Sequence, residues 1–483
     1  MKHYCNRRVS RLSPHPPSGE PDFDRGGPIL PGYETILPLA LAALAAPDAA
    51  QNPTSAEAEK DIKAADRSSA IAAEIAAIRA RLEALESELA TLRATPAKAP
   101  AEPPLGEQTT WKGAPEIESD AGWSFKPRGR LQLDAGWVSE PEGIDDPGLG
   151  LATELRAARL GVEGDMPGGF GYKLELDFAD GDISVADALI SYRANEHLEA
   201  VIGHHKPFQS LEEVTSSRFT SFIERAAFTD AFGFERRVGI SAEYKRGNML
   251  LSGGLFTDDV ESLADDANRA IGLDGRIVYA PLIGAARFHF GGSAHYRDND
   301  SNSRASIAAR YRQRPLIHAT DVRFVSTLPL AIAGESHYGL EFAAVGTPWH
   351  IAAEAHWLTP DLSGGDPDPS FFGGYVEAGI FLTGERRSYD DGAFGRTRLG
   401  DDSQRWGAVQ LNLRYDRLDL GGGAALGGVQ NGYLASLIWI PHDHVRFLLN
   451  YGHILYSDAA IPATGGERDY AVDVIGARAQ IDF

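Results

Sequence analysis

Hydrophobic and polar residues alternate along most of the chain after Trp123. Successive side chains of a β-strand point to opposite faces, so this alternation predicts strands with one apolar and one polar face. Segment 128–137 shows the pattern clearly, because its odd and even positions separate by type. Its apolar face holds Leu131, Leu133, Ala135 and Trp137, and its polar face holds Arg128, Arg130, Gln132 and Asp134. Segments 173–178, 287–297, 445–451 and 475–483 alternate in the same way.

The order of these segments indicates a closed barrel. Up to about 18 alternating segments follow one another along the chain. Short connections between them, such as 166–169 and 193–196, alternate with longer polar connections. The last segment ends the chain on Phe483, and an aromatic end is typical of bacterial outer-membrane barrels. We therefore predict an all-β, closed antiparallel transmembrane β-barrel of 16–18 strands. A soluble β-sandwich is the alternative, but its strands rarely keep a polar face so rich in arginine.

A different period precedes the barrel. Apolar residues recur every 3.5 positions, which places them on one stripe of a helix and calls for a partner helix. This spacing predicts an N-terminal α-helical coiled coil, and a lone amphipathic helix is the alternative. The seam residues are Ile71, Ile75, Ile78, Leu82, Leu85, Leu89 and Leu92.

Three regions follow from these patterns. Residues 1–50 are predicted to be a signal or targeting segment, because the 11-residue apolar run 36–46 is too short to span a bilayer as a helix. Residues 51–110 are predicted to form a periplasmic coiled coil that ends in a Pro/Ala linker. Residues 111–483 are predicted to form the barrel.

Composition removes several classes of function. The only cysteine, Cys5, lies in the predicted targeting segment, ahead of its apolar run, so disulfides and cysteine-bound metals are not expected in the mature protein. A formal net charge of −22 argues against a nucleic-acid partner. The mean hydropathy of −0.25 argues against a helical membrane protein. We expect neither a metal site nor a cofactor.

The longest early interruption of the alternation, 206–234, mixes charged, hydroxyl and aromatic residues. We predict that it folds into the lumen and narrows it, since pore selectivity follows from the charge at such a constriction. The residues predicted to line the pore and bind anions are Arg128, Arg130, Arg159, Lys173, Arg218, Arg225, Arg287, Arg297 and Arg414. For any one of these cations, pairing with a lumen carboxylate is the competing structural role.

Several motifs resemble the phosphate-selective porin O and P family. They are Lys173-Leu-Glu-Leu-Asp-Phe178, Leu211-Glu-Glu-Val-Thr-Ser-Ser-Arg-Phe219, Phe381-Leu-Thr-Gly-Glu-Arg-Arg-Ser-Tyr-Asp390, Trp406-Gly-Ala-Val-Gln-Leu411 and Gln480-Ile-Asp-Phe483. The resemblance implies a trimer of 16-stranded barrels with inward-folded loops and anion-conducting pores. It also implies that a turn from Leu382 to about Asp401 folds into the lumen from the periplasmic side.

One departure from the family bears on selectivity. Its phosphate-specific members are known for lysines and a ladder of arginines, whereas this chain has four lysines after Trp123, namely Lys126, Lys173, Lys206 and Lys245. Arginine is plentiful and binds phosphate in a bidentate manner, so anion preference remains the prediction and tight phosphate selectivity is in doubt.

The leading hypothesis is a non-enzymatic outer-membrane porin of a Gram-negative bacterium. It would pass small anions, including phosphate or polyphosphate, and contact outer-membrane lipid and lipopolysaccharide as a homotrimer. Two alternatives remain open. One is a barrel hydrolase that uses His289 or His295, and the other is a structural barrel tethered through its coiled coil.

Overall fold

The computed structural model describes residues 73, 76–87, 107–111, 113–179, 181–263, 270–299, 307–400 and 406–483. Two compact units divide the chain, one containing Leu105–Phe483 and the other containing Lys2–Pro104. The predicted signal segment lies outside the described residues. Of the predicted coiled coil, residues 76–87 are described, and they are helical and exposed. Their seam positions Ile78, Leu82 and Leu85 are each more than half exposed, and the other four seam residues lie outside the described residues.

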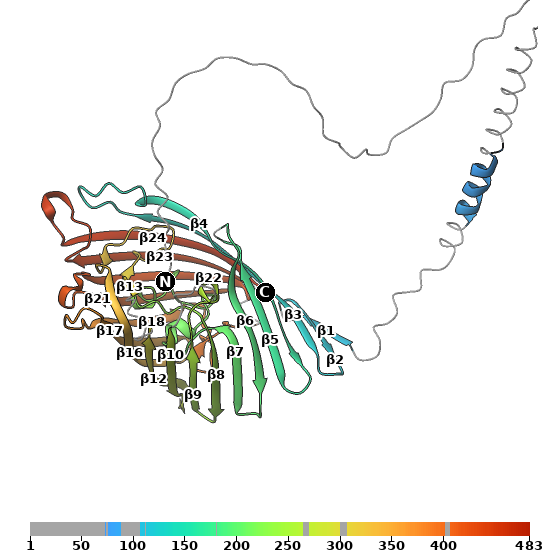
Figure 1. The fold of residues 1–483 in the computed structure, drawn as a ribbon, viewed down its shortest axis with the longest axis horizontal. Coiled ribbons are helices and arrows are strands. Elements are labelled where there is room, and N and C mark those ends of the chain that lie inside the picture. The colour runs from blue at the N-terminus through green and yellow to red at the C-terminus, as the bar shows by residue number, and fades with distance from the viewer. Residues whose placement is uncertain are drawn as a thin grey trace, which may run out of the picture. The chain divides into compact units, whose positions relative to one another are not determined.

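Sixteen antiparallel strands form a closed ring in the larger unit (Figure 1). The ring closes because the last strand pairs with the first, with Arg478 opposite Asp134. The strands are β3 (Ser124–Val138), β4 (Gly150–Met166), β5 (Phe170–Asp177), β6 (Ser184–Arg193), β7 (Leu198–His205), β8 (Arg237–Arg246), β9 (Met249–Phe256), β10 (Ile271–Tyr279), β12 (Ala286–Asp298), β16 (Leu330–Val345), β17 (Trp349–Leu362), β18 (Phe371–Phe381), β21 (Ala408–Asp419), β22 (Val429–His442), β23 (Val445–Ser457) and β24 (Tyr470–Asp482).

The predicted closed antiparallel barrel is confirmed with 16 strands, so the count of 18 alternating segments is too high. The shorter strands of the described residues lie outside the ring. They are β1 (Glu107–Trp111), β2 (Pro115–Ser119), β11 (Leu282–Ile283), β13 (Ile307–Ala309), β14 (Arg312–Gln313), β15 (Val325–Ser326), β19 (Tyr389–Asp390) and β20 (Ala393–Phe394). The remaining 3-10 turns are η1 (Val260–Ser262), η3 (Gly423–Ala425) and η4 (Thr464–Gly466).

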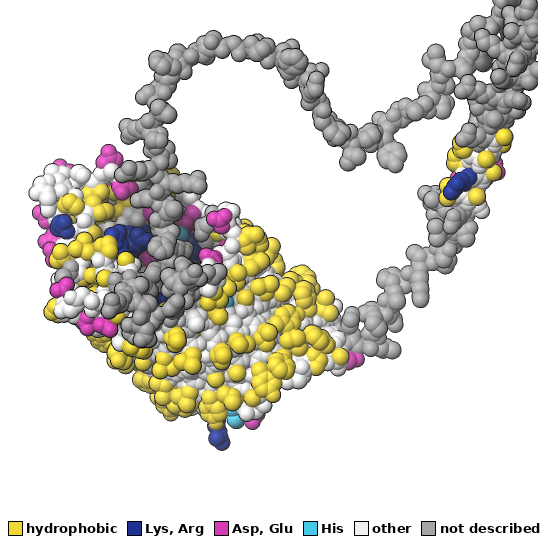
Figure 2. All heavy atoms as spheres, viewed as in Figure 1, with side chains coloured by type: hydrophobic (Ala, Val, Ile, Leu, Met, Phe, Trp, Pro, Cys, Tyr) yellow, Lys and Arg dark blue, Asp and Glu magenta, His cyan; other side chains and the backbone are white. Residues whose placement is uncertain are grey.

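The alternation places side chains as predicted. On β24, Ile475 and Ile481 are each 46% exposed on the outer face, whereas Arg478 is 3% exposed on the inner face. Figure 2 shows hydrophobic side chains spread over the outer wall and charged side chains gathered toward one end. An apolar outer wall with a polar interior is what a barrel in lipid requires.

The two ends of the barrel differ in their connections. At the end that holds Phe483, which we call the turn end, segments 167–169, 194–197 and 247–248 join neighbouring strands. At the opposite end, which we call the loop end, the connections include 206–236 and a loop that ends with 307–329. Segment 382–407 is the exception, because it is long and begins at the turn end.

Loop 206–236 lies inside the barrel, as predicted. It contains α2 (Leu211–Val214) and α3 (Ala227–Ala231), and Phe228 of α3 is fully buried. The Phe228 ring stacks on His356 of β17 with ring centroids 4.3 Å apart. Gly373 of β18 permits this approach, because a Cβ there would lie 2.3 Å from the Cβ of Phe228. The loop therefore packs against strands that are far from it in sequence.

Two further segments fill the lumen beside this loop. Loop 307–329 inserts Ile317 against Gly136 and Gly476, on β3 and β24, where added Cβ atoms would lie 2.4 and 3.0 Å from the Ile317 side chain. The inward turn 382–400 meets loop 206–236 where the Phe394 amide donates to Thr215 Oγ1 at 3.2 Å. The inward fold of this turn agrees with the family resemblance, whereas the insertion of loop 307–329 was not predicted.

Candidate functional site

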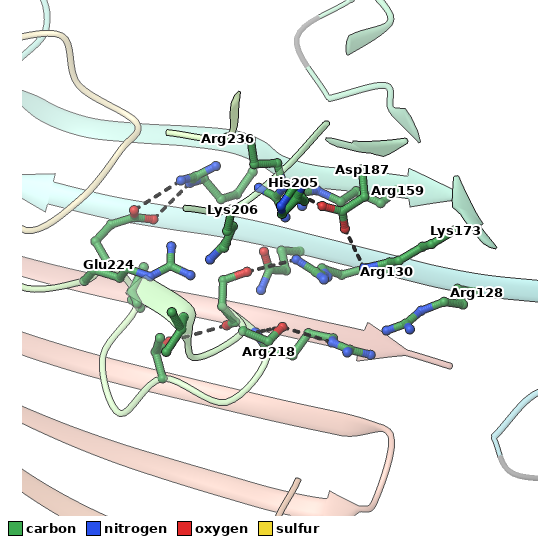
Figure 3. A pocket seen from close by; sticks show the side chains of 18 of the residues that line it. Arg128, Arg130, Arg159, Lys173, Asp187, His205, Lys206, Arg218, Glu224 and Arg236 are labelled. Atoms are coloured by element: carbon green, nitrogen blue, oxygen red, sulfur yellow. Dashed lines mark hydrogen bonds and ion pairs between the residues drawn. The ribbon is translucent and has the colours of Figure 1, made fainter. Parts of the chain in front are cut away.

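A cavity of about 320 Å³ remains between loop 206–236 and the inner wall formed by β3–β7 and β24 (Figure 3). Its lining contains ten cationic side chains and two carboxylates. The cations are Arg128, Arg130, Arg156, Arg159, Lys173, Lys206, Arg218, Arg225, Arg236 and Arg478, and the carboxylates are Asp187 and Glu224. A narrow space lined by one sign of charge focuses the field and concentrates counter-ions.

Six of the nine cations predicted from the sequence lie at this cavity, namely Arg128, Arg130, Arg159, Lys173, Arg218 and Arg225. Four others were missed. Lys206 and Arg236 lie at the two ends of the inserted loop, and the alternation of the last strand already placed Arg478 on the inner face. Arg156 was missed because a β-bulge interrupts β4, where Gln132 pairs with Ala157 and the next residue, Leu133, pairs with Leu155. The bulge turns both Arg156 and Arg159 toward the cavity, although their spacing in a regular strand would place them on opposite faces.

Most of these cations are already paired with carboxylates. Asp187 Oδ2 lies 2.5 Å from Lys173 Nζ, and Asp187 Oδ1 lies 2.8 Å from Arg236 Nε. Glu224 Oε1 lies 2.9 Å from both Arg156 Nε and Arg478 Nη2. The remaining pairs are Arg159 with Asp177 and Glu175, Arg225 with Glu213, and Arg128 with Glu163. These pairs hold the wall and the loop together and leave little charge for a passing solute.

Arg130 and Arg218 have the weakest partners in the cavity. Arg130 Nη1 donates to Ser217 Oγ at 2.9 Å, and the nearest carboxylate oxygen, on Glu175, is 3.7 Å from its guanidinium. Arg130 Nε is buried without a hydrogen-bond partner. Arg218 Nε donates to Ser216 Oγ at 3.2 Å, and its Nη1 lies 3.4 Å from Asp482. Burial, and next the charge of Arg128, lower the pKa of Arg218. The two guanidiniums are therefore the cations best placed to attract an anion.

Lys206, at the start of the inserted loop, is held between groups of both signs. Its Nζ lies 2.7 Å from Glu213 Oε1. Burial, followed by the charge of Arg225, lowers the pKa of Lys206 to about 7. Burial alone would raise the pKa of Glu213, but Arg225 and Lys206 outweigh it and lower that pKa.

We expect this lysine to make selectivity depend on pH near neutrality. The amine loses its proton as pH rises through about 7, so the ratio of anion to cation permeability should fall between pH 6 and pH 8. The loss of one charge at close range corresponds to a change of about two- to fivefold. Reversal potentials measured across this range test the prediction. The variant Lys206→Met should remove the pH step, and a step that persists in this variant would assign it to another group.

The opposite wall anchors the loop through a second ion cluster. Glu377 of β18 accepts from Arg414 Nη2 at 2.6 Å, from Arg387 Nη1 of the inward turn at 3.0 Å, and from Ser221 Oγ of the loop at 2.5 Å. Arg414 Nη2 also donates to Glu212 of α2 at 2.8 Å. Since the Arg414 side chain is fully buried, it fastens the loop and does not face the cavity. This placement differs from its predicted pore-lining role.

Arg287 and Arg297 also lie away from the cavity, in contrast to their predicted position. Arg287, near the turn end of β12, donates from Nη1 to the Ala280 carbonyl at 2.7 Å. Arg297, near the loop end of the same strand, pairs with Asp258. Their alternation was assigned correctly, but position along the strand decides which part of the interior a side chain reaches.

The two histidines of the hydrolase alternative lie in buried hydrogen-bond networks. His289 Nε2 lies 3.1 Å from Glu341 Oε2, and its Nδ1 lies 2.6 Å from the Tyr389 hydroxyl. His295 Nδ1 lies 2.9 Å from Asp274 Oδ1. Among the described residues, no three His, Cys, Asp or Glu side chains are grouped to hold a metal ion. Every helix in that part of the chain is too short or too polar to cross a bilayer.

The inner wall is also hollowed nearer the turn end. A second cavity of about 370 Å³ shares Lys173 and Leu189 with the first, and its lining includes Lys126, Glu163 and Asp165. Both signs of charge are therefore present in this space, in contrast to the mainly cationic lining of the first cavity.

The sequence places this barrel in a known family. A model of the phosphate-selective porin O and P family matches residues 125–483. The chain belongs to that family. The porin is accordingly a β-barrel of the outer membrane of a Gram-negative bacterium. The matched residues contain all 16 strands of the ring except the first residue of β3.

The porin is also similar to other proteins in sequence or in fold. An uncharacterised protein of Caulobacter vibrioides is 44% identical over 480 residues, which cover 92% of this chain and 96% of that protein. Among solved structures, a loop L8 deletion mutant of Vibrio cholerae OmpT has a TM-score of 0.49 at 10% identity, covering 75% of this chain and 100% of that chain. An anion-selective porin from Comamonas acidovorans has a TM-score of 0.47 at 12% identity, with the same coverage.

Proposed function

We propose that this porin is a passive, non-enzymatic channel that prefers small anions and selects them in the 320 Å³ cavity. The observation that carries the proposal is that two of the ten cations in the lining, Arg130 and Arg218, have only distant carboxylate partners. An anion that enters meets two guanidiniums and the hydroxyls of Ser216 and Ser217. Such groups bind carboxylate and phosphate oxygens through charge-assisted hydrogen bonds.

Phosphate is one of the small anions that the cavity would admit. Two of the four barrel lysines, Lys173 and Lys206, line the cavity, and both are paired with carboxylates. Guanidiniums would therefore provide most of the contacts, in the bidentate geometry that suits phosphate. We propose a general anion preference that includes phosphate and polyphosphate, with moderate discrimination among anions.

We also propose that the porin is a homotrimer in contact with outer-membrane lipid and lipopolysaccharide. Its apolar outer wall fits the lipid contact, and the helical residues 76–87 expose three seam positions that a partner helix would cover. The coiled coil of residues 51–110 would then join three copies on the periplasmic side.

Reversal potential across a planar bilayer in a salt gradient tests the channel proposal. Refolded protein from residue 51 onward should give an anion-selective potential, and its conductance should close in three equal steps. Cation selectivity would overturn the anion preference, and single closing steps would overturn the trimer. A barrel that does not conduct at all would support the structural tether instead.

A further inference from the structure

We infer that the porin holds a monatomic anion, such as chloride, in a second site between Phe219 of loop 206–236 and the inward turn 382–400. Such a bound anion would be separate from the solute that the channel passes. The site is a cavity of about 20 Å³, and it shares no lining residue with the 320 Å³ cavity. The lining residues are Phe219, Arg387, Gly395, Arg396, Thr397, Gln410, Ile440, Asp443 and Arg446.

The charge around this cavity is unbalanced. Three guanidiniums and one carboxylate line it, and they come from the inward turn, β23 and the 443–444 turn. Arg387 and Arg396 have carboxylate partners, Glu377 and Asp482, but each partner also serves a second arginine. Glu377 binds Arg414, and Asp482 lies near Arg218.

Arg446 of β23 has no carboxylate of the described residues within 4.0 Å, although it is only 7% exposed. Its Nη1 and Nη2 donate to the carbonyls of Arg218 and Thr220, the latter at 3.0 Å. Its Nε is buried and has no hydrogen-bond partner. A buried charge without a counter-charge is strongly unfavourable, so an anion bound at this guanidinium would stabilise the folded state.

The size of the cavity decides the class of anion. A volume of about 20 Å³ has room for one particle close to the size of a water molecule. Phosphate, with four oxygens around phosphorus, is too large, and an organic carboxylate is larger still. A halide fits the volume and matches the excess positive charge.

An anion at this site would join the two inserted segments. Arg446 already holds the Arg218 and Thr220 carbonyls of the loop, and Arg396 of the turn lies 5.3 Å from the centre of the Phe219 ring. The loop also contributes Arg218 to the 320 Å³ cavity. The halide would therefore stabilise the position of the loop that narrows the lumen.

Bromide provides the direct test. Crystals of the refolded barrel grown or soaked in sodium bromide should show an anomalous peak within hydrogen-bond distance of the Arg446 guanidinium. An ordered water without anomalous signal at that position would overturn the inference. This measurement uses the unaltered protein, so it does not depend on the folding of a variant.

Thermal unfolding gives an independent readout. At equal ionic strength, Tm in potassium chloride should exceed Tm in potassium gluconate by about 2 °C or more, because an anion that binds only the folded state stabilises it. The variant Arg446→Gln should lose this difference, and Arg287→Gln, which changes an arginine outside both cavities, should keep it. An equal chloride effect in Arg446→Gln and the unaltered protein would count against the site.

Discussion

Replacing Arg130 and Arg218 together by glutamine is expected to lower the anion/cation permeability ratio about tenfold or more. Both side chains line the cavity, and their nearest carboxylate oxygens lie 3.7 and 3.4 Å away. Each charge acts on a passing ion at close range, where a unit charge in water is worth about 1 kcal/mol at 4 Å, or about fivefold. Reversal potentials in a salt gradient measure the change directly.

Glutamine removes the charge but keeps a polar side chain of intermediate length, so the cavity should keep most of its shape. Single-channel conductance in high salt, where charge is screened, should therefore change much less than selectivity. This contrast separates lost attraction from a collapsed pore.

The matched control is Arg287→Gln. This arginine was also predicted to line the pore, but the structure places it at the turn end, where it donates to the Ala280 carbonyl. Its replacement should leave the permeability ratio within about twofold of the unaltered protein, since charge away from the constriction has a weak effect on a screened ion. Equal effects of the control and the double variant would show that selectivity comes from overall charge and not from the cavity.

Replacing Glu377 by glutamine is expected to destabilise the barrel by about 3–5 kcal/mol, because breaking a buried ion pair leaves its partner charge uncompensated. Glu377 is 1% exposed and contacts Arg414, Arg387 and Ser221. The free energy of unfolding in detergent, measured by denaturant titration of tryptophan fluorescence, gives the magnitude.

The same substitution should also widen the pore. Glu377 links the strand wall to loop 206–236 through Ser221 and to the inward turn through Arg387. Without its charge, the loop loses part of its attachment, and single-channel conductance should rise. Proteolysis within 206–236 should become faster for the same reason.

The control for this substitution is Glu196→Gln, which removes a carboxylate that is 85% exposed in the short turn between β6 and β7. We expect a change of no more than about 0.5 kcal/mol there, as for most exposed positions. If Glu377→Gln proves as stable as this control, the cluster around Glu377 does not anchor the loop.

The strands were predictable because their pattern is local. Each residue of a strand points to the face opposite its neighbour, so Lys173 and Glu175 could be placed inside and Leu174 outside from their spacing alone. The last strand was assigned in the same way. The inward position of loop 206–236 was also predictable. Exposing aromatic side chains such as Phe222 and Phe228 to water would be unfavourable, and the structure buries both.

The cavity was only partly predictable. The position of Arg156 at the cavity depends on a β-bulge, which the alternation of residue types cannot reveal. Arg414 was placed on the correct face, but its charge is neutralised by ion pairs with Glu377 and Glu212. Glu212 is about 200 residues away from Arg414 in the chain, and the sequence of neither segment predicts that the two side chains pair. Loop 307–329 carries no pattern that distinguishes it from an external loop.

The amino-acid order alone thus settles the strand faces, the antiparallel barrel and the abundance of arginine inside it, because these depend on period-two geometry and composition. Only the tertiary structure decides which arginines remain available to a solute. That choice depends on long-range partners, since a carboxylate brought close by the fold neutralises Arg159 or Arg478, whereas Arg130 and Arg218 are left with hydroxyls and distant carboxylates.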